Sequence, residues 1–240
     1  MKDLVSVIMP VHNCIEYLPD CIESVLSQSY EDIQFIILDD CSSEPVWDLI
    51  CKYKEKDNRI LALQNSKNMG LTKSLNICLK YAKGKYIARQ DGDDISFTER
   101  IEYQVESFKN NDVGLVSTWG MAIDETGSVQ ENKYCDKVIR NPVSVIKKGL
   151  RKQNYILGPS AMYSKAVVDK IGGYDEKCYF SQDLNYWMRI IQYFDIDVVP
   201  KDLYLLRKHN KSVRRLSITK GSDNSKLARD RAISNPIIKW

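Results

Sequence analysis

Short apolar runs alternate with amphipathic stretches through the first hundred residues, and this alternation constrains the fold more than any other feature of the sequence. The apolar runs are rich in β-branched residues and bounded by turn formers, which is typical of buried strands. Between them, apolar positions recur every three or four residues, which indicates helices that pack one face on a sheet. This order predicts an α/β protein with a parallel sheet and helices on both faces. The predicted strands are residues 4–9, 33–38, 60–63 and 85–88, and the predicted helices are residues 15–28, 45–56 and 70–82.

The alternation weakens in the second half of the chain, where the sequence predicts fewer elements. Gly84 is interpreted as the C′ residue that ends the third helix. The length of 240 residues, 43% of them hydrophobic, is enough for one domain with a full core. The later expected elements are a helix beginning near residue 97, a strand at 114–118, a turn at 125–128, and helices at 142–152 and 182–193.

The cysteines and the apolar runs bear on the compartment. The seven cysteines are odd in number and no two form a Cys-x-x-Cys pair, which favours reduced thiols in a cytosolic protein over a zinc site or a disulfide framework. No apolar run approaches the length of about 18 residues that spans a bilayer, and the N-terminus resembles no signal peptide. We therefore expect a cytoplasmic protein that does not span a membrane by itself.

Charge is distributed unevenly along the chain. Residues 201–240 hold 11 Lys and Arg against 3 Asp and Glu, while the preceding residues hold 24 against 29. A basic end is interpreted either as a solvated tail or as an anchor for anionic lipid headgroups or nucleic acid. Of these, we expect the first two and not nucleic acid.

Two acidic clusters follow two of the predicted strands. Asp39 and Asp40 follow the second strand, and the DGDD segment at 91–94 follows the fourth. The carboxyl ends of parallel strands meet at one edge of a sheet, where ligands bind. Crowded carboxylates are costly to ionise together unless a cation neutralises them, and Mn²⁺ or Mg²⁺ would also leave positions for phosphate oxygens. The alternative, a solvated loop that caps a helix, fits this position in the chain less well.

Six motifs then occur in the order seen in the family 2 glycosyltransferases of the GT-A fold, which the chain resembles from about residue 4 to residue 213. The resemblance implies a Rossmann-like, mostly parallel central sheet flanked by helices, with a smaller acceptor-side sheet. The motifs are VSVIMPVHN (5–13), LDDCS (38–42), NMGL (68–71), DGDD (91–94), GGYD (172–175) and QD (182–183). The implied divisions are a glycosyltransferase domain over 1–215, with a nucleotide-binding half of about 1–118 and an acceptor half of about 119–215, and a basic tail at 216–240.

The resemblance assigns the ends of the first strands to the nucleotide. Asp40 would accept the N3–H of a uracil ring, Asp91 would lie by the ribose, and Gly92 lets backbone and ligand approach closely. Asp93 would bind a metal that bridges the diphosphate, with His209 as a further ligand. The implied nucleotide-binding residues are Pro10, Val11, Asn13, Asp39, Asp40, Asn68, Lys73, Asp91 and Gly92.

The resemblance also places a catalytic base in the second half. Family members open a helix below the acceptor with a Glu-Asp pair, and the Asp takes a proton from the attacking hydroxyl. Here the pair is Gln182 and Asp183, so only the Asp is kept. A carboxylate within about 2.6 to 3.2 Å of a sugar hydroxyl can act in this way, whereas the alternative role is a first-turn charge favoured by the helix dipole. The other donor or acceptor loop residues are Asp94, Gly158 and Ser160, for which a plain turn at 158–161 is the alternative.

The sequence therefore predicts a metal-dependent inverting glycosyltransferase that uses Mn²⁺ or Mg²⁺ and a nucleotide-sugar donor, UDP-linked. The expected setting is bacterial cell-surface polysaccharide or glycolipid synthesis. The expected partners are that donor, a saccharide or lipid-linked saccharide acceptor, an anionic membrane reached peripherally by the tail, and a second copy in a homodimer.

Two alternatives stay open. A nucleotidyltransferase shares the sheet and the carboxylates, but it would place a glycine-rich basic loop after the first strand, and none is present. A degenerate nucleotide-sugar-binding module is supported by the missing Glu beside Asp183. A dinucleotide-binding fold is disfavoured because no G-x-G-x-x-G follows the first strand.

Overall fold

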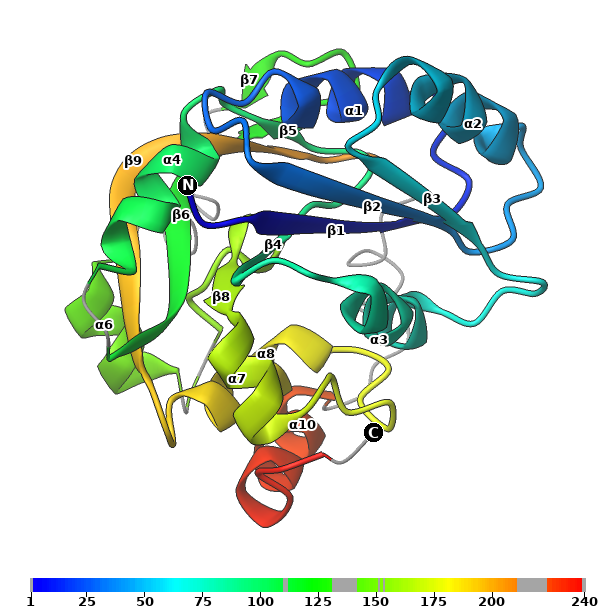
Figure 1. Cartoon of the computed structure of the whole chain (residues 1–240). Helices are drawn as coiled ribbons and strands as arrows, with labels where there is room; N and C mark the ends of the chain where they lie inside the picture. Colours follow the sequence, from blue (N-terminus) through cyan, green and yellow to red (C-terminus); the bar gives the residue numbers. More distant parts are fainter. Residues whose placement is uncertain are drawn as a thin grey trace.

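One continuous sheet organises the chain in the computed structural model, which describes residues 2–109, 112–130, 142–150, 152, 154–210 and 224–238. The strand order is β3-β2-β1-β4-β8-β6-β9-β5, and β7 pairs with β6 off this path (Figure 1). The strands are β1 (Val5–Val11), β2 (Ile33–Asp39), β3 (Ile60–Gln64), β4 (Tyr86–Arg89), β5 (Ile95–Ser96), β6 (Val113–Ile123), β7 (Val129–Gln130), β8 (Met162–Ser164) and β9 (Asp195–Arg207).

The four strands β3, β2, β1 and β4 are parallel, as predicted. Helices α1 and α2 lie on one face of them and α3 lies on the other (Figure 1). Val7 and Met9 of β1 join the core on the side of α1 and α2, whereas Ile8 joins the core that contains α3. The strands are therefore apolar on both faces, which explains their unbroken apolar runs. The helices are α1 (Leu18–Leu26), α2 (Val46–Lys56), α3 (Leu71–Tyr81), α4 (Arg100–Ser107), α6 (Val143–Gly149), η1 (Gly158–Ser160), α7 (Lys165–Ile171), α8 (Gln182–Ile190) and α10 (Asn224–Ser234).

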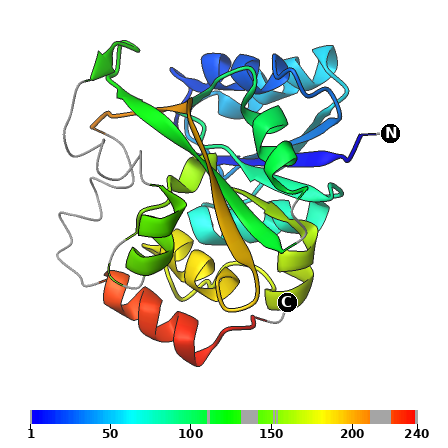
Figure 2. The same cartoon turned by 90° about the vertical axis from the view of Figure 1, so that its left-hand side faces the viewer.

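The acceptor-side strands continue the same sheet in mixed directions. β8 runs antiparallel to both β4 and β6, while β6 and β9 are parallel. The long strands β6 and β9 lie side by side in Figure 2. Because β9 also pairs with β5, its end returns to the loop that follows β4. This return brings residues 207–209 to the DGDD segment.

Two local expectations were wrong. The helix expected near residue 97 begins at Arg100, because Ile95 and Ser96 form β5 against β9. Gly84 is not a C′ residue, since α3 is capped by Ala82 in an extended conformation. A side chain on Gly84 would instead meet the Ser6 backbone nitrogen at 2.5 Å, so the glycine allows the chain to pass close to β1.

Part of the expected tail is packed into the fold. α10 lies against α8 (Figure 1), with Ala228 and Ala232 fully buried. Ile238 forms a bridge to Gly172, and Arg231 pairs with Asp175 at 2.6 Å. Small side chains let the two helices approach closely, so residues 224–238 are not the separate tail that we expected. Residues 211–223 and 239–240 lie outside the described residues.

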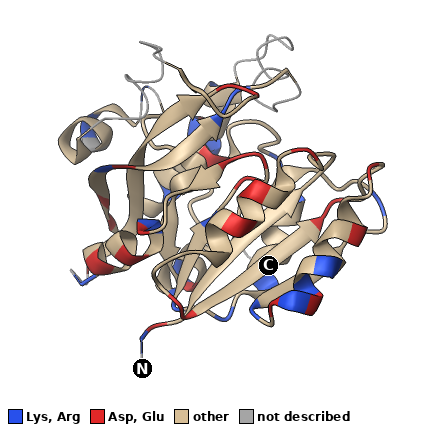
Figure 3. Ribbon diagram, turned by 90° about the horizontal axis from the view of Figure 1, so that it is seen from above, with Lys and Arg blue, Asp and Glu red and all other residues tan. Residues whose placement is uncertain are grey.

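The described residues give no sign of a membrane span or of one basic face. None of their helices has both the length and the apolar character that crossing a bilayer requires. Seen from above (Figure 3), their Lys and Arg are interspersed with Asp and Glu.

Candidate active site

β1 and β4 separate near the end of β1, where Pro10 lies within this buried central strand. The Ile8 carbonyl accepts the Gln90 amide just beyond the last residue of β4. Pro10 faces the same side two residues later, past the end of the pairing with β4, so its missing N–H loses no ladder bond. The Val11 carbonyl still accepts the Asp40 amide at 2.8 Å. β1 thus stays joined to β2 while it separates from β4.

Asp39 is buried and its carboxylate is held by its own turn. Oδ1 accepts hydrogen bonds from the backbone N–H and the hydroxyl of Ser42, at 3.0 and 2.6 Å, and Oδ2 accepts one from Gln64 at 3.0 Å. Three of about four acceptor positions are filled. Asp39 therefore shapes the turn after β2.

Asp40 binds the loop that precedes α3. Its Oδ1 accepts from the Asn65 amide and the Met69 backbone, and its Oδ2 accepts from the Gly70 backbone, at 2.7 to 2.8 Å. One acceptor position on Oδ2 stays open for a ligand donor. Lys73, expected near the nucleotide, is exposed on the first turn of α3.

His12 connects three of the predicted motifs. Its Nδ1 lies 3.1 Å from the Asp40 carbonyl, which can only accept, so Nδ1 carries the proton. Its Nε2 then accepts from the Asn68 amide at 3.1 Å and from the Asn13 amide at 3.3 Å. Asn13 also accepts the Ser43 amide at 2.8 Å. Asn13 and Asn68 are thus gathered at this edge, as predicted.

Gly92 makes a close approach within the protein itself. A side chain there would meet Val11 Cγ1 at 2.5 Å and Cys14 Sγ at 3.2 Å. The glycine therefore lets the DGDD segment pack on the end of β1. This packing by itself explains why residue 92 is a glycine.

Buried polar side chains hold the DGDD segment in place through hydrogen bonds. The Gln90 amide donates to the Asp94 carbonyl at 3.2 Å, while its oxygen accepts from Arg100 and from Ser96. The Tyr204 hydroxyl of β9 accepts the Asp91 amide at 3.3 Å. β4, α4 and β9 therefore jointly fix the segment.

Asp93 and His209 meet although 116 residues separate them. His209 Nε2 lies 2.7 Å from Asp93 Oδ2, and the two side chains are 25% and 9% exposed in the order Asp93, His209. The Arg207 guanidinium donates to the Asp93 carbonyl and lies 4.6 Å from the centre of the Tyr17 ring. That ring is 5.2 Å from the imidazole of His209. This arrangement fixes both predicted metal-binding side chains.

Asp94 differs from its expected place in the donor or acceptor loop. It is 1% exposed, and its Oδ1 accepts the Arg207 amide at 2.8 Å. Burial raises the pKa of the Asp94 carboxyl, and the charges of Asp93 and Asp91 raise that pKa further. Asp94 joins the DGDD segment to β9 and does not face a substrate.

Asp183 lies in the first turn of α8, after Ser181 in a left-handed conformation. Its Oδ1 accepts the Leu184 amide, and its Oδ2 accepts from the Asn154 side chain, both at 2.8 Å. A side chain on Gly158 would lie 2.9 Å from that Oδ2. Gly158 therefore lets the Asp183 carboxylate pack closely on the backbone of η1, and its assignment to the substrate loop stays a prediction.

Two other expected loop residues are turned inward. Ser160 is fully buried, and its hydroxyl donates to the Leu157 carbonyl at 3.0 Å and lies 3.1 Å from the hydroxyl of Ser117. The expectation that Ser160 contacts a substrate was wrong, because η1 folds it onto β6. Gln182 is 9% exposed at the start of α8, which leaves little of it to meet a ligand.

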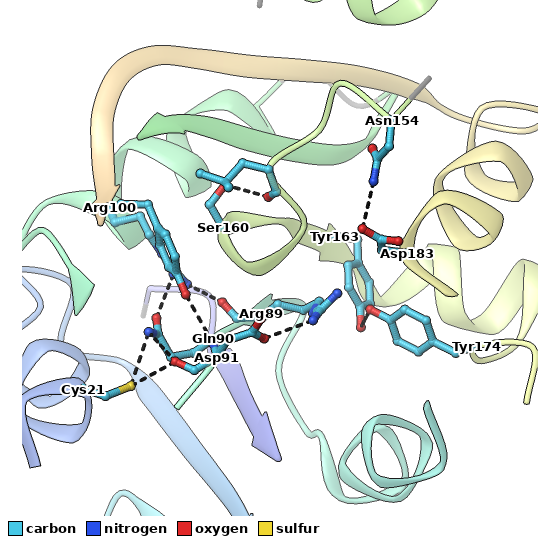
Figure 4. A network of polar contacts seen from close by, with 12 residues as sticks. Cys21, Arg89, Gln90, Asp91, Arg100, Asn154, Ser160, Tyr163, Tyr174 and Asp183 are labelled. Atoms are coloured by element: carbon cyan, nitrogen blue, oxygen red, sulfur yellow. Dashed lines mark hydrogen bonds and ion pairs between the residues drawn. The ribbon is translucent and has the colours of Figure 1, made fainter. Parts of the chain in front are cut away.

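Arg89 is the residue that the sequence did not single out. Its guanidinium ends between Asp91 and Asp183, beside Tyr163 and Tyr174 (Figure 4), and its Nη2 lies 3.0 Å from Asp91 Oδ1. Burial alone would lower the pKa of Arg89, but its anionic neighbours, Asp91 foremost, hold that pKa above its ordinary value. Burial raises the pKa of Tyr174 to about 12, so this hydroxyl stays neutral. The sequence signal that could have identified Arg89 is a charged residue at the end of the apolar run KYIAR.

Comparison with known proteins supplies the family. The model of glycosyl transferase family 2 matches residues 6–172, more than half of the chain. The chain belongs to glycosyl transferase family 2. The match covers the Asp39-Asp40 turn and the DGDD segment, ends at Gly172, the first residue of the GGYD motif, and does not reach Asp183.

Relatives and a solved structure extend this assignment. The family 2 enzyme is 36% identical to an uncharacterised glycosyltransferase of Methanocaldococcus jannaschii, over 88% of this chain and 72% of the relative. It is 40% identical over 111 residues, 46% of this chain and 43% of the relative, to the UDP-Glc:α-D-GlcNAc-diphosphoundecaprenol β-1,3-glucosyltransferase WfaP of Escherichia coli. A mannosyltransferase of Pyrobaculum calidifontis, solved with GDP-Man and Mn²⁺, superimposes with a TM-score of 0.69 at 14% identity, over 98% of this chain and 63% of that one. The enzyme thus has the GT-A fold that we expected.

Proposed function

We propose that this glycosyltransferase moves a sugar from a UDP-linked donor to an acceptor hydroxyl, with inversion at the anomeric carbon and with a bound Mn²⁺ or Mg²⁺. The observation that carries the proposal is the placement of Asp91 on one side of Arg89 and of Asp183 on the other (Figure 4). A donor-binding edge and a base therefore flank one site.

The base assignment rests on the environment of Asp183. Asn154 holds one oxygen of the carboxylate at 2.8 Å, and acceptor positions on both oxygens stay open for a hydroxyl proton. As the acceptor oxygen forms its bond to the anomeric carbon, its proton passes to Asp183 and the bond from that carbon to the diphosphate breaks. The leaving diphosphate takes the electron pair. Attack on the face opposite the leaving group inverts the anomeric configuration.

The residues present fit the implied metal. Asp93 offers a carboxylate oxygen and His209 an imidazole nitrogen, donors that Mn²⁺ accepts. The described residues contain no cluster of three or more His, Cys, Asp or Glu that could hold an ion, so phosphate and water oxygens would complete the shell. When bound, such an ion would neutralise the charge of the leaving diphosphate.

The proposed nucleotide rests on the open position on Asp40 and on a named relative. A carboxylate oxygen can accept the N3–H of uracil, and WfaP is named for a UDP-glucose donor. The mannosyltransferase of the same fold binds GDP-Man, so the family fold by itself does not choose the base. The remaining acceptor position on Asp40 fits the N3–H of uracil and also the N1–H of guanine, so the choice of UDP rests on the name of WfaP.

The acceptor that we propose is a saccharide or a lipid-linked saccharide in bacterial polysaccharide or glycolipid synthesis. The support is WfaP, whose name specifies a diphosphoundecaprenol-linked sugar as acceptor. An enzyme acting on such acceptors in the cytoplasm would meet an anionic membrane surface, for which the basic residues after 201 are suited. Sedimentation with anionic vesicles, compared between the wild-type chain and a full-length variant with Lys211, Arg214, Arg215 and Lys220 replaced by Gln, tests this contact.

A donor panel tests the proposed function. Hydrolysis and transfer would be measured with UDP-, GDP- and dTDP-sugars in the presence of Mn²⁺ or Mg²⁺, and UDP binding by calorimetry. We expect a UDP-sugar to be preferred, and Asp93→Ala or EDTA to weaken UDP binding by about tenfold or more. Binding that is unchanged by both treatments would refute the metal site.

A further inference from the structure

Arg89 is a buried, positively charged residue at the end of β4, where the strand itself requires no charge. All four residues of β4 are buried, and the Arg89 side chain is only 3% exposed. Its Nη2 pairs with Asp91, while its Nε is buried without a hydrogen-bond partner among the described residues. A buried ion pair is costly relative to apolar residues of the same size, so packing alone does not explain an arginine here.

Gly158 shows what Arg89 faces on its other side. A side chain on this glycine would begin 3.6 Å from Arg89 Nη1 and 2.9 Å from Asp183 Oδ2. The two charged groups thus pack close to the same glycine, whose missing side chain lets both approach the backbone there. Figure 4 shows the guanidinium pointing into the region between Asp91 and Asp183.

The two carboxylates come from opposite halves of the molecule. Asp91 follows β4 in the nucleotide half, and Asp183 begins α8 in the acceptor half. Arg89 thus pairs with Asp91 and lies near Asp183, and its charge acts on both carboxylates. Its anionic neighbours outweigh the effect of burial and keep its pKa raised, so it stays charged.

We propose that Arg89 is a positioning residue for the transfer step, which sets the Asp183 carboxylate relative to Asp91 and so to the bound donor. This proposal rests on the proposed function of Asp183 as the base. Arg89 exchanges no proton and forms no bond with the sugar. Its contribution acts through Asp183, so its loss lowers kcat more than it weakens donor binding.

A double-mutant cycle tests this role. Arg89→Met, Asp183→Asn and the double variant would be assayed in the full chain with Mn²⁺ and the UDP-sugar that reacts fastest in the donor panel. We expect Arg89→Met to lower kcat by about tenfold or more, and to change KM for the donor by less than about threefold. In the Asp183→Asn background the same substitution should lower kcat by less than about twofold. Arg89→Lys, which keeps the charge, should recover part of the loss.

Arg59→Met is the matched control. Arg59 forms another Arg–Asp pair, with Asp57 at 2.7 Å, at the amino end of β3 and away from the site. We expect its loss to leave kcat unchanged. Melting temperatures of both variants separate stability from turnover, and Arg89→Gln replaces Arg89→Met in the cycle if the methionine variant does not fold.

The outcomes separate the two proposals. If Asp183→Asn retains the wild-type kcat, Asp183 is not the base and both proposals fail. If Asp183→Asn lowers kcat but the Arg89 substitution costs the same factor in both backgrounds, only the role of Arg89 fails. It also fails if Arg89→Met matches Arg59→Met in kcat.

Discussion

The amino-terminal half and the carboxyl-terminal half of the chain hold their carboxylates in different ways. Asp39 and Asp40 each accept three hydrogen bonds, and their partners include the backbone of the loops that surround them. Asp183 accepts two, of which one comes from a side chain, and it packs closely on Gly158. Carboxylates of the first kind are part of the scaffold, while the second kind is available for chemistry. Substitution of Asp40 should therefore affect stability, whereas substitution of Asp183 should affect kcat.

The largest expected effect is that of Asp183→Asn. Loss of a general base lowers kcat by about 10²- to 10⁴-fold. UDP affinity by calorimetry and the melting temperature should remain those of the wild type, because no backbone outside its own turn depends on this carboxylate. A parallel loss of UDP affinity would place Asp183 in the donor site and remove the contrast between the halves.

Gly158→Ala should have the next largest effect. Its new methyl group would lie 2.9 Å from Asp183 Oδ2, so the carboxylate must move. A displacement of about 1 Å at a reacting group can cost about 10²-fold in rate. Steady-state kinetics should show the loss in kcat, whereas unchanged turnover would mean that the base is not confined there.

Asp40→Ala should act on stability as well as on nucleotide binding. The substitution leaves the Met69 amide without its acceptor and the Gly70 amide with only Asn68 Oδ1, which costs about 1–3 kcal/mol. Urea unfolding measures this loss. A variant as stable as the wild type would show that this carboxylate is not part of the scaffold.

Ser160→Ala should have the smallest effect. The lost hydrogen bonds are internal, so we expect about 1 kcal/mol of lost stability and unchanged KM values for donor and acceptor. A changed KM with unchanged stability would restore the substrate contact that the sequence predicted and the structure does not show.

The sequence predicted the first half of the fold well because its signals are local. β1, β2 and β4 are buried on both faces along almost their whole length, so composition marks them directly. β6 and β9 were harder because their register shifts between Thr118 and Trp119 and again before Met121, which breaks the alternation of side chains. β8 has three residues, too few for a pattern.

The candidate site divides in the same way. Asp40, Asn68 and Asp93 lie directly after strands or on short loops, so motif order placed them at one edge. The burial of Ser160 and Asp94 depends on β6 and β9, which are distant in sequence. The surroundings of Arg89 could not be predicted from the local sequence, since Asp91 is two residues away but Asp183 is on α8.

The contact between Asp93 and His209 bears on how the enzyme matures. Because 116 residues separate the pair, a chain emerging from the ribosome completes the parallel strands β1 to β4 long before His209 is made. Non-local pairings such as β6 with β9 form late, after the entropy of a long loop has been overcome. A nascent chain can thus present the Asp39-Asp40 turn and the DGDD segment while it still lacks His209 and Asp183. Transfer competence would then arise only when the last strand is in place, which keeps a half-made enzyme from consuming its donor.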